Sequence, residues 1–343
     1  MQIIKHMADN MNCHPIMDEL DKFYAISSEK VSKEKLIKPS FDNSFQMLND
    51  IFTVYGHSFY DVSFVDKNYE PLKLPKYNDK NVIVCFSGGK DSVAVALWCK
   101  EHGYNVYLYH LKNVNPIFDE YQATLELAKK LGLPIYVDEV TVSGHHEYIE
   151  HPMKNMIIAN NAINYGVKNG IGTQIAFGNY VDSTLDVDAF DWCGGDDIEM
   201  WYAYEEIIQK AIPKFRIQFC LRNLGDTLDI VCKDRDIVNI TISCLGRAGL
   251  RNYRRQWVKD KFDIELPTHR CGSCYKCAVE YIYMADHDLQ KYSPEYYRYC
   301  LDRLKINAKR ETGVKLTDEQ VWERCFFYDI AQSKYLQSQK SVV

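Results

Sequence analysis

The 343-residue sequence has no long apolar run, and none of its hydrophobic stretches approaches the roughly 18 to 20 residues that span a bilayer. Residues 1–15 are too polar to form the hydrophobic core of a signal peptide. Internal repeats and low-complexity tracts are also absent. These absences argue against membrane, secreted and fibrous proteins, so we expect a cytoplasmic protein with no membrane partner. A chain of this length corresponds to about two domains.

The sequence also lacks a general excess of positive charge. Its 41 Lys plus Arg residues are outnumbered by 47 Asp plus Glu, which gives a net charge of -6. A protein that coats nucleic acid would carry a basic field over its surface, so that class is disfavoured. Only the last third is basic, with a net charge of +5 from residue 244 onward against -11 for residues 1–243.

The hydrophobic pattern changes at residue 81, where a continuous apolar run (residues 82–86) is typical of a strand buried on both faces of a parallel sheet. Helix-like and strand-like segments then alternate, which predicts a doubly wound parallel α/β sheet of Rossmann-like type over residues 80–243. We expect residues 1–79 to form an N-terminal appendage with a strand-like segment at 58–66. We expect residues 244–343 to form a mostly helical, zinc-binding region. Helices are expected at 93–102, 117–131, 155–168 and 199–212, and strands at 105–111, 134–140, 174–178 and before residue 241.

A glycine-rich loop, residues 87–92 (Ser-Gly-Gly-Lys-Asp-Ser), follows the buried strand and opens the next helix. The glycines permit a tight turn whose backbone N–H groups converge at a helix N-terminus, which suits a phosphate or pyrophosphate. Lys90 can bind phosphate oxygens through its positive charge, and Asp91 is expected to bind a Mg²⁺ ion that contacts the phosphates. The spacing is not that of a Walker A loop. The loop residues expected to bind ATP are Ser87, Gly88, Gly89, Lys90, Asp91 and Ser92.

This loop resembles the S-G-G-x-D-S signature of the PP-loop ATP pyrophosphatase superfamily. The resemblance implies an enzyme that uses ATP and Mg²⁺ to adenylate a carbonyl or carboxylate, with release of pyrophosphate and with Lys90 and Asp91 in catalysis. It also implies that Tyr109 and His110, after the second strand, contact ATP. It does not select the substrate, because the superfamily makes amides, nitriles, thionucleosides and reduced sulfate.

The sequence contains twelve cysteines and no secretory signal, so clustered cysteines indicate metal binding or catalysis before disulfides. Cys271, Cys274 and Cys277 are spaced as three ligands of a tetrahedral Zn²⁺ site, and Gly272 permits a tight turn between the first two. The fourth ligand is Cys244 or His269. Two alternatives to a zinc site remain, namely thiols without a metal and an iron–sulfur cluster.

The run C-G-x-C-x-x-C, preceded by Thr-Ile-Ser-Cys at residues 241–244, is similar to the zinc ligands of the 7-cyano-7-deazaguanine synthases, the QueC family. The resemblance covers about residues 81–283 and implies that Cys244 completes a structural zinc site. The interval between the first two ligands is longer than in that family, so residues 245–270 contain an insertion. Within it, the arginines at 247, 251, 254 and 255 share one face of a helix, either as a solvated surface or as a phosphate or partner site.

Residues 152–155 (Pro-Met-Lys-Asn) are similar to a P-x-R-N element of the same family, with Lys154 in place of arginine as a catalytic cation. Asp196 and Asp197 could accept hydrogen bonds from the donor edge of a guanine-like base, or could simply cap the following helix. The residues implied for substrate binding are Asn155, Gly178, Asp182, Asp196 and Asp197.

The QueC resemblance implies an ATP-dependent ligase that converts a 7-carboxy-7-deazaguanine-type carboxylate and ammonia into an amide or nitrile, releasing AMP and pyrophosphate. It also implies a homodimer. A QueC-like defence protein would instead conjugate the deazaguanine to a protein partner, through residues 1–79 or the 245–270 insertion. The phosphate loop is also compatible with a tRNA-thiolating PP-loop enzyme, which needs a catalytic cysteine pair and a basic RNA surface. Two further alternatives are a sulfonucleotide reductase and a nucleotide-sensing module.

Overall fold

A computed structural model describes residues 24–27, 61–64, 71–112, 120–139, 151–180, 198–244, 246, 248–313, 315–326 and 333–341. Two short strands in the N-terminal part, β1 (Tyr24–Ser27) and β2 (Asp61–Phe64), pair antiparallel. β2 lies within the strand-like segment expected at 58–66. Among the described residues, no helix combines the length and the apolar character needed to cross a bilayer.

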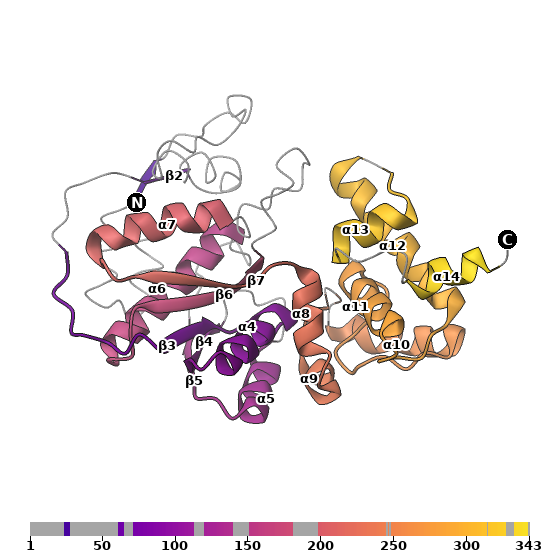
Figure 1. The fold of residues 1–343 in the computed structure, drawn as a ribbon, viewed down its shortest axis with the longest axis horizontal. Coiled ribbons are helices and arrows are strands. Elements are labelled where there is room, and N and C mark those ends of the chain that lie inside the picture. Colours follow the sequence, from indigo (N-terminus) through magenta and orange to yellow (C-terminus); the bar gives the residue numbers. More distant parts are fainter. Residues whose placement is uncertain are drawn as a thin grey trace.

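The centre of the molecule is a five-stranded parallel sheet with the order β5-β4-β3-β6-β7 (Figure 1). The chain builds it outward from the middle strand in one direction and then returns to the other side, so β3 has β4 on one side and β6 on the other. This reversal creates the switch point at which ligands bind in open α/β sheets. The strands are β3 (Asn81–Cys85), β4 (Asn105–Lys112), β5 (Ile135–Glu139), β6 (Gln174–Tyr180) and β7 (Arg216–Leu221).

Helices cover both faces of the sheet, as expected for a doubly wound fold (Figure 1). The side chains of Val82 and Val84 pack with α4 (Lys90–Glu101) and α5 (Tyr121–Leu131). On the opposite face, Ile83 and Cys85 pack with α6 (His151–Lys168) and α7 (Ile198–Ala211). These four residues of β3 are almost completely buried, which explains the continuous apolar run in the sequence.

A helical region follows β7 and lies beside the sheet (Figure 1). Its core is continuous with that of the sheet, because one hydrophobic cluster includes Val84, Tyr281 and Trp322. The helices are α8 (Leu224–Val231), α9 (Arg235–Ile240), α10 (Ala248–Phe262), α11 (Tyr275–Asp286), α12 (Pro294–Thr312), α13 (Asp318–Phe326) and α14 (Lys334–Lys340).

The prediction of a strand before Thr241 is wrong, because this segment forms helix α9 (Arg235–Ile240). The Asp234 carboxylate caps the helix by accepting hydrogen bonds from the backbone N–H groups of Asp236 (2.9 Å) and Ile237 (3.3 Å). Ile237 and its neighbour Val238 are buried in the core. The cap and this burial outweigh the strand preference of β-branched residues.

Candidate functional site

The glycine-rich loop lies at the carboxyl end of β3, next to β6 and therefore at the switch point of the sheet. Gly88 has a left-handed backbone (φ +76°), and a Cβ there would lie 2.7 Å from the Thr124 hydroxyl oxygen. Gly89 is the N-cap of α4, which begins at Lys90, three residues earlier than the sequence pattern predicts. The loop therefore lies at a helix N-terminus, where an anion would bind. The amides of Gly89 and Lys90 donate here to the hydroxyls of Ser87 (3.3 Å) and Ser243 (3.0 Å).

The two serines of the loop hold it in a closed turn. The Ser92 hydroxyl donates to the carbonyl oxygen of Gly89 (3.0 Å) and accepts from the backbone N–H of Ser87 (3.2 Å). The hydroxyl groups of Ser87 and Ser92 are 3.3 Å apart. These bonds position the loop before any ligand is present.

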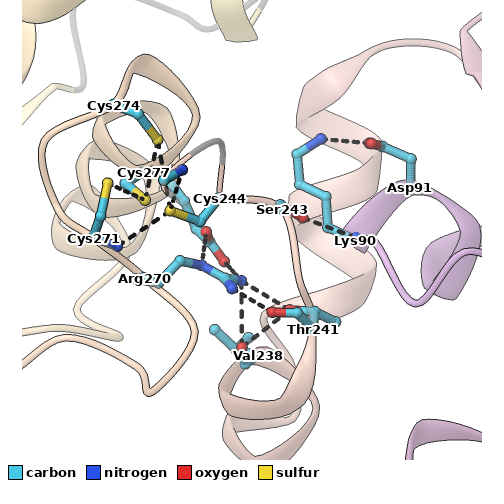
Figure 2. Close-up of polar contacts among 12 residues, drawn as sticks. Lys90, Asp91, Val238, Thr241, Ser243, Cys244, Arg270, Cys271, Cys274 and Cys277 are labelled. Atoms are coloured by element: carbon cyan, nitrogen blue, oxygen red, sulfur yellow. Dashed lines mark hydrogen bonds and ion pairs between the residues drawn. The ribbon is translucent and has the colours of Figure 1, made fainter. Parts of the chain in front are cut away.

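Lys90 and Asp91 form an ion pair, with 2.5 Å between Nζ and Oδ1 (Figure 2). The Tyr180 hydroxyl donates to the same carboxylate oxygen. The Lys90 side chain is 8% exposed and that of Asp91 is 33% exposed. Burial alone would raise the pKa of Asp91, but Lys90, Tyr180 and the charge of Lys276 together lower it. Asp91 is therefore ionised at neutral pH and available to a divalent cation.

Tyr180 is a residue of this site that the sequence analysis missed. It ends β6, two residues after Gly178, and Thr227 of α8 donates to its hydroxyl (3.4 Å). Gly178 is also needed here, because a Cβ would lie 2.8 Å from the carbonyl carbon of Asp91. The position of Gly178 at a strand end was visible in the sequence, but the role of the tyrosine beside it was not.

Tyr109 and His110, expected to contact ATP, lie on opposite faces of β4 and both are buried. The ring of His110 is hydrogen-bonded through Nδ1 to the carbonyl oxygen of Phe86 (2.9 Å), directly before the loop. Burial lowers the pKa of His110, so its imidazole is neutral at pH 7. Tyr109 instead reaches toward Asp138 (3.4 Å), on the α6 face.

The remaining residues implied for the substrate are only partly described. Asn155 is buried in the second turn of α6. Lys154 lies on the same helix, and its side chain lies outside the described part of the structure. Asp182, Asp196 and Asp197 also lie outside the described residues. The substrate side of the site therefore stays a prediction.

The second centre is the cysteine cluster. Cys244, Cys271, Cys274 and Cys277 offer four sulfur atoms that all lie within 4.8 Å of one another (Figure 2). His269 does not belong to this group. Gly272 has φ +68°, and a Cβ there would lie 2.8 Å from the Tyr296 hydroxyl, so the tight turn requires glycine.

The spacing of the sulfur atoms suits one ion. Cys274 Sγ lies 3.4 Å from Cys277 Sγ and 4.0 Å from Cys244 Sγ, and Cys271 Sγ lies 4.0 Å from Cys277 Sγ. Tetrahedral ligation at about 2.3 Å places sulfur atoms about 3.8 Å apart. In a [4Fe–4S] cluster each of the four cysteines binds a different iron atom, so the cysteine sulfur atoms lie farther apart than around a single ion.

Backbone N–H groups also favour charged sulfur in this cluster. Gly246 and Cys271 donate to Cys244 Sγ (3.2 and 3.3 Å), and Ser273 donates to Cys271 Sγ (3.4 Å). A site that stabilises thiolates in this way fits a thiophilic divalent metal.

A buried ion pair lies directly beside the cluster. Arg270 and Glu280 have side chains that are each 2% exposed, and the guanidinium contacts both carboxylate oxygens. The same guanidinium donates to the carbonyl oxygen and to the hydroxyl (2.8 Å) of Thr241. Despite the opposing effect of burial, Glu280 raises the pKa of Arg270. Sequence reasoning missed this pair, because neither residue belongs to a motif.

The arginines expected on one face of the insertion do not form one surface. Arg251 is buried, and its Nε donates to the carbonyl oxygen of Gly246 (2.6 Å) beside the cysteine cluster. Arg254 is exposed, and Arg255 donates to the carbonyl oxygen of Thr268 (2.5 Å). Arg247 lies outside the described residues. The strip is divided because α10 packs one of its arginines inward against the metal loop.

The fold and the loop define the class: a doubly wound α/β protein with a phosphate-binding type of loop at its switch point and a four-cysteine centre that could hold a metal ion. No protein-family model matches the chain, and no curated protein matches it either.

Two solved structures are similar to parts of the chain. One is the U34-tRNA thiolase NcsA from Methanococcus maripaludis with its [4Fe-4S] cluster, at 13% identity and a TM-score of 0.34, over 48% of this chain and 59% of the thiolase. The other is NMN synthetase from Francisella tularensis, at 12% identity and a TM-score of 0.31, over 69% of this chain and 89% of the synthetase. The chain thus spans less than two thirds of the thiolase.

Replacing Gly88 with alanine is expected to weaken anion binding at the loop at least about tenfold, with Mg-ATP as the probe. The left-handed backbone costs an alanine about 1 to 2 kcal/mol, and the new Cβ collides with Thr124, which moves the loop amides. Gly103→Ala is the matched control, because Gly103 has φ +77° with open space around it. Equal ATP affinity in the two variants, measured by calorimetry, would contradict this role of the loop.

Proposed function

We propose that the protein is an ATP-dependent adenylating enzyme of the PP-loop type, and that its substrate is a 7-carboxy-7-deazaguanine-like carboxylate, as in the QueC family. The observation that carries the proposal is the association of two motifs in one site. The Ser-Gly-Gly-Lys-Asp-Ser loop lies at the switch point, and the segment that supplies Cys244 to the cysteine centre contacts this loop (Figure 2).

In the proposed reaction, a carboxylate oxygen of the substrate attacks the α-phosphorus of ATP, and pyrophosphate leaves. The loop amides and Lys90 bind the pyrophosphate, whose negative charge grows as the bond breaks. Ammonia then attacks the acyl adenylate, AMP leaves and an amide forms. A second adenylation, on the amide oxygen, followed by loss of AMP gives a nitrile.

Asp91 is the residue placed to bind Mg²⁺ beside the phosphates, since its carboxylate is ionised and one third exposed. Before a nucleotide is bound, Lys90 neutralises this carboxylate. The bound Mg²⁺ supplies charge neutralisation of the phosphates. Tyr180 fixes the orientation of the carboxylate through its hydroxyl.

For the cysteine centre we propose Zn²⁺ in a structural role. The support is that the four sulfur atoms are close enough to bind a single ion. Four thiolate ligands leave no coordination position for a substrate. Cys244, Cys271, Cys274 and Cys277 would hold the ion, which would join the segment before α10 to the start of α11.

The second candidate is thiolation of a tRNA base after adenylation of its oxygen. The basic C-terminal third and the exposed residues Tyr253 and Arg254 of α10 favour an RNA surface. Against it, the clustered cysteines are spaced for one ion. A further pair, Cys99 and Cys220, with sulfur atoms 3.7 Å apart, is buried between α4 and β7, where no RNA base can reach.

The test is mass spectrometry of a reaction with the purified protein, Mg-ATP, ammonium and 7-carboxy-7-deazaguanine, with AMP and pyrophosphate measured in parallel. The proposal expects AMP formation that depends on the deazaguanine, together with an amide or nitrile product. Absence of both products and of substrate-dependent AMP would reject the deazaguanine substrate. A parallel reaction with unmodified tRNA and a sulfur donor tests the second candidate.

A further inference from the structure

Residues 241–244, here called the bridging segment, lie between the phosphate loop and the cysteine centre (Figure 2). On the loop side, the backbone N–H of Ile242 donates to the carbonyl oxygen of Gly88 (3.0 Å), and the N–H of Lys90 donates to the Ser243 hydroxyl (3.0 Å). On the other side, Cys244 belongs to the metal-binding group. Four consecutive residues therefore contact both sites.

The cysteine centre and its neighbours fix the bridging segment in place. Arg270, next to Cys271, donates to the Thr241 hydroxyl (2.8 Å) and to the carbonyl oxygen of Val238 (3.3 Å). At the other end, the backbone N–H of Cys271 donates to Cys244 Sγ (3.3 Å). Ser243 has little freedom to move while these contacts and the metal ligands are in place.

The Ser243 hydroxyl has a hydrogen that is available to a ligand. Its oxygen accepts a hydrogen bond from the backbone N–H of Lys90, the first residue of α4. In the part of the chain that the structure describes, the hydroxyl hydrogen has no acceptor. This hydroxyl therefore lies beside an amide at a helix N-terminus, where a phosphate oxygen is expected, with its own hydrogen free to donate.

We propose that Ser243 is a phosphate-binding residue of the nucleotide site and that the metal centre sets its position, so that metal binding and ATP binding reinforce each other. The proposal rests on the nucleotide part of the proposed function and is independent of the deazaguanine substrate. Linkage requires the effect to be reciprocal: the metal strengthens ATP binding, and ATP strengthens metal binding by the same factor.

The first experiment is calorimetric titration of Ser243→Ala, Ser243→Thr and the control Ser338→Ala. Ser338 is an exposed residue of α14 whose hydroxyl bonds with the Tyr335 carbonyl oxygen (2.7 Å) and with Tyr292. For Ser243→Ala, the Kd values for Mg-ATP and Mg-pyrophosphate are expected to rise roughly ten- to a hundredfold, the effect of one hydrogen bond to a charged group. Adenosine affinity stays unchanged, and Ser243→Thr retains ATP binding within about twofold. An equal loss of adenosine affinity would show a merely structural role and overturn the proposal, as would unchanged affinities.

The second experiment measures the rate at which the protein releases its metal to a chromogenic chelator, with and without Mg-ATP. ATP is expected to slow the release severalfold in the wild type and to have little effect in Ser243→Ala. The same slowing in both proteins would overturn the linkage through Ser243. Wild-type protein that binds no ATP would instead refute the proposed function, so the two failures are distinguishable.

Discussion

Under the proposed Zn²⁺ site, replacing Cys277 with serine is expected to remove the ion and to lower the melting temperature by roughly 10 °C or more. Cys277 is buried at the first turn of α11, with its sulfur 3.4 Å from that of Cys274. A structural Zn²⁺ contributes on the order of 10 kcal/mol to the folding of small domains, and a hydroxyl is a poor substitute for a thiolate ligand. A loss of several kcal/mol corresponds to this shift in a chain of this size.

The measurements are metal content by elemental mass spectrometry and unfolding by circular dichroism. Cys325→Ser is the matched control, because Cys325 is half-buried on α13 and lies outside the cluster. It should retain one metal ion per chain and melt close to the wild type. A Cys277→Ser variant that keeps its metal and its melting temperature would disprove the assignment of this cysteine as a ligand.

Replacing Asp91 with asparagine is expected to lower the rate of AMP formation on the order of 10³-fold and to abolish the Mg²⁺ dependence of ATP binding. The substitution keeps the shape of the side chain but removes the charge that would hold the cation beside the phosphates. It also leaves the Lys90 ammonium, which is 8% exposed, without its carboxylate partner.

Asp236→Asn provides the comparison, because Asp236 also pairs with a lysine, Lys130 (2.8 Å), but its side chain is exposed and lies outside the loop. This variant should keep wild-type activity. Since the pKa of Asp91 is lowered, the carboxylate stays ionised as pH falls to the usual aspartate range. The wild-type rate should therefore show no loss from this group between pH 8 and 5. A variant Asp91→Asn with more than a tenth of the wild-type rate would exclude Asp91 from metal binding.

Most of the sheet could be predicted from sequence because its inner strands β3, β4 and β6 are largely buried and therefore form mostly apolar runs. The segments expected at 105–111, 134–140 and 174–178 correspond to β4, β5 and β6, within two residues at each end. The edge strand β7 and helix α8 were not expected. β7 is mixed in polarity, with exposed Arg216 and half-buried Gln218, so periodicity alone does not reveal it.

The site was predictable only where residues form a contiguous motif. The loop residues and the cysteines have recognisable spacings, whereas Tyr180, Ser243 and Arg270 act through contacts made across the fold. Ser243 reaches Lys90 over a separation of 153 residues, and Arg270 reaches Thr241 over 29. No local pattern encodes such partners, since they depend on which strand neighbours which in the sheet and on the closure of the metal loop.

The bridging segment has a consequence for the order of events during synthesis. The nucleotide loop is translated early, but Ser243 and the last ligand, Cys277, emerge much later. At ribosomal rates the interval is on the order of ten seconds or longer. A nascent chain that already contains the Ser-Gly-Gly-Lys-Asp-Ser sequence thus lacks the contacts that complete its nucleotide site. Under the proposed linkage, full ATP affinity is expected only after residues 241–277 have been synthesised and folded.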